Sequence, residues 1–169
     1  MPIFQKSVIQ KYLAHLDQSQ LDAAFKIFQQ NYSVDKIQQT LKEEEYQDGF
    51  LRDIFVEVFG YTLKPAAHFN LVREFNNQTD GKKADGAILK EGNAIAVIEL
   101  KSTKTKDLTS ITEQAFNYKY NQPHCQYVIT SNFQKLRFYI DYANEYEEFD
   151  LFYLDKEAFA LLYFLGAIL

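Results

Sequence analysis

The chain has 169 residues, a formal net charge of −5 and an ordinary globular composition, 47% hydrophobic and 24% charged. Its single cysteine, Cys125, excludes an internal disulfide and favours a reducing, cytoplasmic location. No signal peptide is visible, and the longest apolar run, residues 158–169, is shorter than the roughly 20 residues of a membrane span, so we expect no membrane partner. An acidic chain is not a general polyanion binder, so any nucleic-acid contact needs a local basic patch or a second domain.

Apolar residues recur at helical spacing through the first third of the chain. Residues 8–16 and 21–28 predict two helices, with Asp17 as a start signal between them. Thr40, with a glutamate three residues later, matches a capping box and predicts a third helix that ends at Gly60.

From residue 69 onward the pattern changes to short β-branched and apolar runs separated by turn residues. We expect strands at residues 69–75, 85–89, 94–100, 126–130, 135–142 and 149–154, and helices at 107–121 and 156–169. This order predicts an α/β fold with a mixed central sheet flanked by helices. We interpret residues 1–169 as one domain: a helical portion (1–40), a core (41–142) and a C-terminal strand and helix (143–169).

The end of the strand at 94–100 carries the most informative side chains. Glu99 and Lys101 alternate around Leu100 and therefore point to the same face of an otherwise apolar strand. A buried charge there is costly unless it is paired or binds a metal. Pairing through a turn centred on Gly92 would place Asp85 opposite Glu99, with their Cβ atoms about 5 Å apart.

Two carboxylates at that distance repel each other unless a cation lies between them. Hard oxygen donors with open positions suit Mg²⁺, which keeps several waters. A neighbouring ammonium, Lys101, could act on a metal-bound water and offset charge on a phosphorane-like transition state. The residues thus predict metal-dependent phosphodiester hydrolysis.

Asp85 followed by Glu99-Leu100-Lys101 after a hairpin resembles the D…(D/E)-x-K signature of the PD-(D/E)xK nuclease superfamily, although Ala84 stands where the pattern often has proline. The acidic helix that ends at Gly60 resembles the opening helix of restriction-enzyme nuclease domains. The chain most resembles the N-terminal endonuclease module of Type IIG restriction-modification enzymes, with a restriction-endonuclease-like fold.

The resemblance implies that Asp85, Glu99 and the Leu100 carbonyl hold Mg²⁺, which Mn²⁺ can replace. It also implies that Lys101 assists the attacking water and that Glu45, counted back from Gly60, supports the metal site. The implied substrate is double-stranded DNA, and the implied partners are fused methyltransferase and target-recognition domains, which would make this chain a fragment of a longer one.

Further DNA contacts are expected from the helix and loops around the site. Gln114 and Tyr118 resemble a Gln-x-x-x-Tyr helix of the superfamily, and Gln114 would lie near the DNA backbone or the catalytic lysine. Lys83 and Lys104 belong to a group of lysines near the site, either a phosphate-binding patch or solvated side chains.

Other interpretations of the same residues remain open. Glu99 and Lys101 could form a plain ion pair, Glu45 could be part of a favourable first helical turn, and Gln114 and Tyr118 could be an ordinary helix face. The alternative functions are a stand-alone repair or recombination nuclease and a non-catalytic DNA-binding module with the same fold.

Overall fold

The computed structural model describes residues 2–35, 43–77 and 79–168, with the side chains of residues 43–45, 167 and 168 excepted. Its helices are α1 (Lys6–Leu13), α2 (Gln18–Asn31), α4 (Glu43–Phe50), the π-helix η1 (Leu51–Val56), α5 (Thr109–Tyr120) and α6 (Lys156–Ile168). Its strands are β1 (Leu71–Asn76), β2 (Lys83–Lys90), β3 (Asn93–Leu100), β4 (Tyr127–Ser131), β5 (Lys135–Ile140) and β6 (Tyr146–Asp150).

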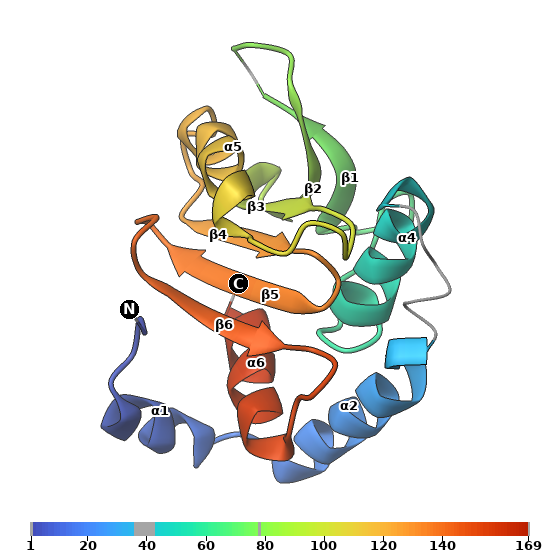
Figure 1. Ribbon diagram of the computed structural model, residues 1–169, viewed down its shortest axis with the longest axis vertical. Coiled ribbons are helices and arrows are strands. Elements are labelled where there is room, and N and C mark those ends of the chain that lie inside the picture. The colour runs from blue at the N-terminus through green and yellow to red at the C-terminus, as the bar shows by residue number, and fades with distance from the viewer. Residues whose placement is uncertain (1, 36–42, 78, 169) are drawn as a thin grey trace.

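The six strands form one sheet in which the spatial order follows the chain order, from β1 to β6. Neighbouring strands are antiparallel except for β3 and β4, which are parallel and are joined by the crossover helix α5. Figure 1 shows α5 on one side of the sheet and α2, α4 and α6 on the other. The expected mixed sheet flanked by helices is therefore confirmed.

Apolar side chains fill both faces of the sheet. On the larger side α2, η1 and α6 pack against alternate residues of the central strands, and this cluster includes Phe28, Phe55, Ile98, Phe138 and Phe159. On the other side α5 covers a smaller cluster that includes Val97, Ala115, Phe116, Val128 and Tyr139. None of the described helices combines the length and the apolar character that a membrane crossing requires.

The predicted helix start at Asp17 and the predicted helix end at Gly60 are both confirmed. Asp17 caps α2, because its Oδ1 accepts hydrogen bonds from the backbone N–H groups of Ser19 (2.9 Å) and Gln20 (3.3 Å). Gly60, which comes after η1, has φ +84°, as expected for a helix stop. The proposed cap Thr40 lies outside the described residues.

The expected strand at residues 149–154 is wrong in its position. Strand β6 ends at Asp150, whose Oδ1 accepts the N–H of Phe152 and turns the chain away from the sheet. The strand instead begins at Tyr146 and includes Glu147 and Glu148, polar residues suited to an exposed sheet edge. The apolar residues after Asp150 pack against the core from a turn, which a sequence pattern cannot distinguish from a strand.

Helix α6 approaches the end of η1 closely at Gly166. A Cβ atom built at Gly166 would lie 2.6 Å from Cδ1 of the Phe59 ring. The hydroxyl of Tyr61 donates to the Gly166 carbonyl at 2.6 Å. The absence of a side chain at this position therefore allows the helix to dock.

Candidate active site

The β2–β3 hairpin sets the candidate site, because its register places the two carboxylates. Gly86 pairs with Ile98 and Ala87 with Val97, so the next position along the strands brings Asp85 beside Glu99. The register shifts between Ile88 and Leu89, nearer the turn. The expected pairing about Gly92 is thus reached, with an irregularity that the alternation pattern did not predict.

Asp85 is tied to the end of β3 through the backbone. Its Oδ2 accepts a hydrogen bond from the N–H of Leu100 at 2.7 Å. The Leu100 side chain is fully buried in the opposite, larger core, so only the backbone of this residue is available to the site. This contact holds the Asp85 carboxylate at the position where β3 leaves the sheet.

Glu99 is a buried carboxylate that joins β3 to α5. Its side chain is only 2% exposed, and its Oε1 accepts hydrogen bonds from Gln114 Nε2 at 2.7 Å and from Lys101 Nζ at 3.3 Å. Burying an ionised carboxylate is tolerated when charged and polar donors compensate it, as these two groups do. The structure therefore brings three of the predicted site residues, Glu99, Lys101 and Gln114, into direct contact.

Tyr118 completes this cluster on α5. Gln114 Nε2 also donates to the Tyr118 hydroxyl at 3.0 Å. Burial raises the pKa of Tyr118, and the nearby charges of Glu99 and Asp85 add to this, whereas the Gln114 hydrogen bond and Lys101 act in the opposite direction. Tyr118 is thus a neutral phenol within electrostatic range of all three charged site residues.

A cleft of about 740 Å³ borders this cluster. Gln114 and Tyr118 line it together with Lys82, Ser110, Glu113, Asn117 and Tyr120. Ser110, Glu113 and Asn117 were not among the predicted site residues, although they recur with Gln114 at the three- and four-residue spacing of one helix face. That spacing is the signal that could have found them.

The donor set suits a hard divalent cation that keeps several waters. Within the part of the chain that the structure describes, no group of three or more histidine, cysteine, aspartate or glutamate side chains is arranged to hold a metal. Two carboxylates on paired strands, Asp85 and Glu99, fit the one or two that protein Mg²⁺ sites commonly use. The oxygen-only chemistry therefore fits Mg²⁺ better than a metal that prefers nitrogen or sulfur ligands.

The match to a known family spans almost all of these elements. The family model described as the Type I restriction enzyme R protein N terminus matches residues 7–147, from α1 to β6. The chain belongs to this family. No curated protein matches the chain, and no solved structure does.

Membership of the R-protein N-terminal family confirms the expectation of a restriction-enzyme domain. The description of this family names a Type I enzyme, so the resemblance to Type IIG modules and to the PD-(D/E)xK superfamily stays a prediction. The same holds for the roles assigned to individual residues, which the family match does not test.

In this R-protein N-terminal domain the two predicted lysines lie close to Asp85 and Lys101 along the chain. Lys83 forms an ion pair with Glu74 of β1 at 3.6 Å, and both side chains are largely exposed. Lys104 is exposed in the loop between β3 and α5. Neither position shows a contact with Glu99, so their DNA-binding role stays a prediction.

Glu45 lies in the first turn of α4, and its side chain is outside the described residues. The helix itself is tied to the hairpin side of the sheet, because Asp48 of α4 forms an ion pair with Arg73 of β1. Arg73 pairs with Gly86, the neighbour of Asp85. The expected support of the metal site by Glu45 therefore remains a prediction.

Proposed function

We propose that this chain is the DNA-cleaving domain of a restriction enzyme and that it hydrolyses phosphodiester bonds of double-stranded DNA with Mg²⁺, which Mn²⁺ can replace. The observation that carries the proposal is the shared oxygen of Glu99. This Oε1 atom binds both Lys101 and Gln114, while Asp85 lies at the adjacent position of β2. A plain ion pair between Glu99 and Lys101 would not require that the Glu99 carboxylate be buried and also bound by Gln114 of α5.

The metal would be held by the carboxylates of Asp85 and Glu99 and by the Leu100 carbonyl. When bound, Mg²⁺ supplies charge stabilisation at the phosphate and lowers the pKa of a coordinated water. The protein orients the two carboxylates that would hold the metal. Gln114 holds Glu99 in one rotamer, and the Leu100 N–H holds Asp85.

Lys101 supplies the positive charge that the reaction needs at the phosphate. Its ammonium lies 3.3 Å from Glu99 Oε1 and its side chain is 27% exposed, so one side faces the carboxylate and another remains accessible. An ammonium is a compact point charge that attracts phosphate oxygens and can hold or release a proton near a water. These features support the proposal that Lys101 is the catalytic lysine.

DNA affinity must come in part from outside this domain. The chain carries a formal charge of −5, whereas non-specific DNA binding depends on neutralising phosphates with lysine and arginine. The family name places such domains at the N terminus of the R protein of Type I restriction enzymes. We propose that other domains or subunits of such an enzyme deliver the DNA, in place of the fused methyltransferase module expected from the Type IIG resemblance.

The test is nicking of supercoiled plasmid DNA, with Mg²⁺ and with a chelator. We expect Lys101→Ala to reduce the nicking rate by at least about 100-fold, the usual cost of removing a group that stabilises transition-state charge. Lys90→Ala is the matched control, because Lys90 is an exposed lysine of β2 at the opposite end of the hairpin.

Equal loss in both lysine variants, or nicking that survives the chelator, would contradict the proposed mechanism. A wild-type chain that nicks no DNA even at high protein concentration would favour the non-catalytic alternative. Circular dichroism spectra of both variants would show whether any loss reflects misfolding.

A further inference from the structure

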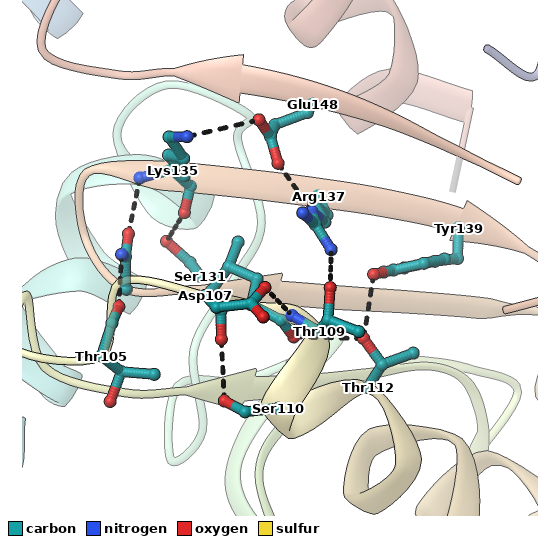
Figure 2. A network of polar contacts seen from close by, with 12 residues as sticks. Thr105, Asp107, Thr109, Ser110, Thr112, Ser131, Lys135, Arg137, Tyr139 and Glu148 are labelled. Carbon is teal, nitrogen blue, oxygen red and sulfur yellow. Dashed lines mark hydrogen bonds and ion pairs between the residues drawn. The ribbon is translucent and has the colours of Figure 1, made fainter. Parts of the chain in front are cut away.

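The loop between β3 and α5, residues 101–108, carries three lysines: Lys101, Lys104 and Lys106. The turn between β4 and β5 fastens this loop by a network of polar contacts. Figure 2 shows this network spanning the loop, the start of α5, and strands β5 and β6. We call residues 101–108 the lysine loop.

Asn132 makes the central contact between the turn and the lysine loop. Its side chain is buried, with 2% exposure, and its Nδ2 donates to the Thr105 carbonyl at 2.7 Å. Its Oδ1 accepts the backbone N–H groups of Gln134 at 3.2 Å and Lys135 at 2.7 Å. The two ends of one amide therefore serve different purposes: the oxygen shapes the turn and the nitrogen holds the loop.

Both ends of the lysine loop are also fixed. At its start, the N–H of Lys101 donates to the Ser131 carbonyl at 2.9 Å. At its end, Asp107 Oδ1 accepts the N–H of Thr109 at 2.9 Å, and Arg137 Nη1 donates to Thr109 Oγ1 at 3.2 Å. Asn132 thus acts on the middle of a loop whose ends are already held.

From this geometry we infer that Asn132 is a positioning residue, which holds the lysine loop so that Lys104 and Lys106 can meet DNA phosphates beside the candidate active site. Thr105 is half-buried, whereas its neighbours Lys104 and Lys106 are both exposed. Fixing the Thr105 carbonyl therefore fixes the backbone between two exposed cations. A preorganised loop loses less conformational entropy when it binds, which raises affinity without any new contact. This inference rests on the proposed function, because it assigns DNA as the ligand of the loop.

The variant Asn132→Asp separates the two purposes of the amide. An aspartate keeps the oxygen that accepts from Gln134 and Lys135, but it lacks the donor to the Thr105 carbonyl and places a negative charge beside that carbonyl. Asn93→Asp is the matched control, since it adds the same charge at the first residue of β3, where Asn93 Nδ2 donates to the Glu91 carbonyl at 3.4 Å.

The first measurement is amide hydrogen exchange. We expect Asn132→Asp to speed exchange at Thr105, whose N–H bonds the Ser102 carbonyl at 3.0 Å, by at least tenfold, while Lys135 keeps its protection. Unchanged exchange at Thr105, or equal acceleration at Thr105 and Lys135, would overturn the positioning role.

The second measurement is the affinity for a short DNA duplex at low salt, by fluorescence anisotropy. We expect Asn132→Asp to weaken binding about tenfold and Asn93→Asp to weaken it less than threefold. In a Lys104→Ala/Lys106→Ala background the effect of Asn132→Asp should fall below twofold, because coupled residues are not additive. A full effect in that background, or a wild-type chain that binds no duplex, would overturn the role in DNA binding.

Neither measurement uses catalysis, so the two proposals can fail separately. Plasmid nicking that persists while the exchange and affinity effects are absent overturns only the role of Asn132. Both effects without any nicking overturn the proposed nuclease activity and support a loop that holds DNA.

Discussion

A single oxygen atom, Glu99 Oε1, illustrates what the sequence could and could not predict at the scale of residues. Alternation along β3 placed Glu99 and Lys101 on one face, and the hairpin register placed Asp85 next to them. Periodicity did not predict the contact between Gln114 and Glu99, because it depends on how α5 docks on the sheet after an eight-residue loop; only the resemblance to a Gln-x-x-x-Tyr helix placed Gln114 near the catalytic lysine or the DNA backbone. Local periodicity determines which face a side chain takes, but docking depends on the packing of the whole core.

Thr130 gives a prediction that concerns a neighbour of the site. It pairs with Glu99 across the parallel strands and is fully buried, and its hydroxyl has no hydrogen-bond partner among the described residues. We expect Thr130→Val to raise the free energy of unfolding by about 1 kcal/mol, because a buried polar group that makes no hydrogen bond is costly. Urea denaturation would measure this.

The control for Thr130 is Thr112→Val on α5. The Thr112 hydroxyl contacts the Leu108 carbonyl at 3.1 Å and the Tyr139 hydroxyl at 3.2 Å, so its removal should lower the free energy of unfolding by about 1 kcal/mol. Similar destabilisation in both variants would mean that Thr130 is hydrogen-bonded in solution, and the prediction would be wrong.

At the scale of elements, helices and strands were predictable where one face is buried and the other is not. The strands of the hairpin and helix α5 lie within two residues of their expected bounds. Strand β6 was misplaced because it lies at the sheet edge, where polar residues such as Glu147 and Glu148 are favoured. Composition alone does not reveal which strand will become an edge.

Helix α6 gives a prediction in which packing and helix propensity have opposite signs. Gly166→Ala should stabilise an isolated helix by about 1 kcal/mol. In this chain the new Cβ would overlap Phe59, whose ring atoms lie 2.6 and 2.7 Å away. We therefore expect Gly166→Ala to lower the free energy of unfolding by about 1–3 kcal/mol, measured by thermal or urea denaturation.

A double-mutant cycle separates the two effects at Gly166. In a Phe59→Ala background the overlap is gone, so Gly166→Ala should become neutral or stabilising. Persistent destabilisation in that background would show that the Phe59 ring is not the cause.

At the scale of the whole molecule, the candidate metal site should couple cation binding to stability. A cation that binds only the folded chain raises its free energy of unfolding by about 1.4 kcal/mol at ten times its dissociation constant, and therefore raises its melting temperature by about 4 °C for a chain of this size. We expect such a rise with millimolar Mg²⁺ or Mn²⁺, and its loss in Asp85→Asn and Glu99→Gln. Glu91→Gln, in the exposed β2–β3 turn, is the control. No metal-dependent shift in the wild type would contradict a cation site between Asp85 and Glu99.

The agreement between strand order and chain order has a consequence for the way this protein folds during synthesis. Each strand that leaves the ribosome can pair with the strand synthesised just before it. Among the described strands, only the parallel pair β3 and β4 needs a crossover connection, which α5 provides. The hairpin that carries the candidate site can thus form before α6 is synthesised. Until α6 is synthesised, the part of the larger apolar face that it covers stays open, which exposes the nascent chain to aggregation.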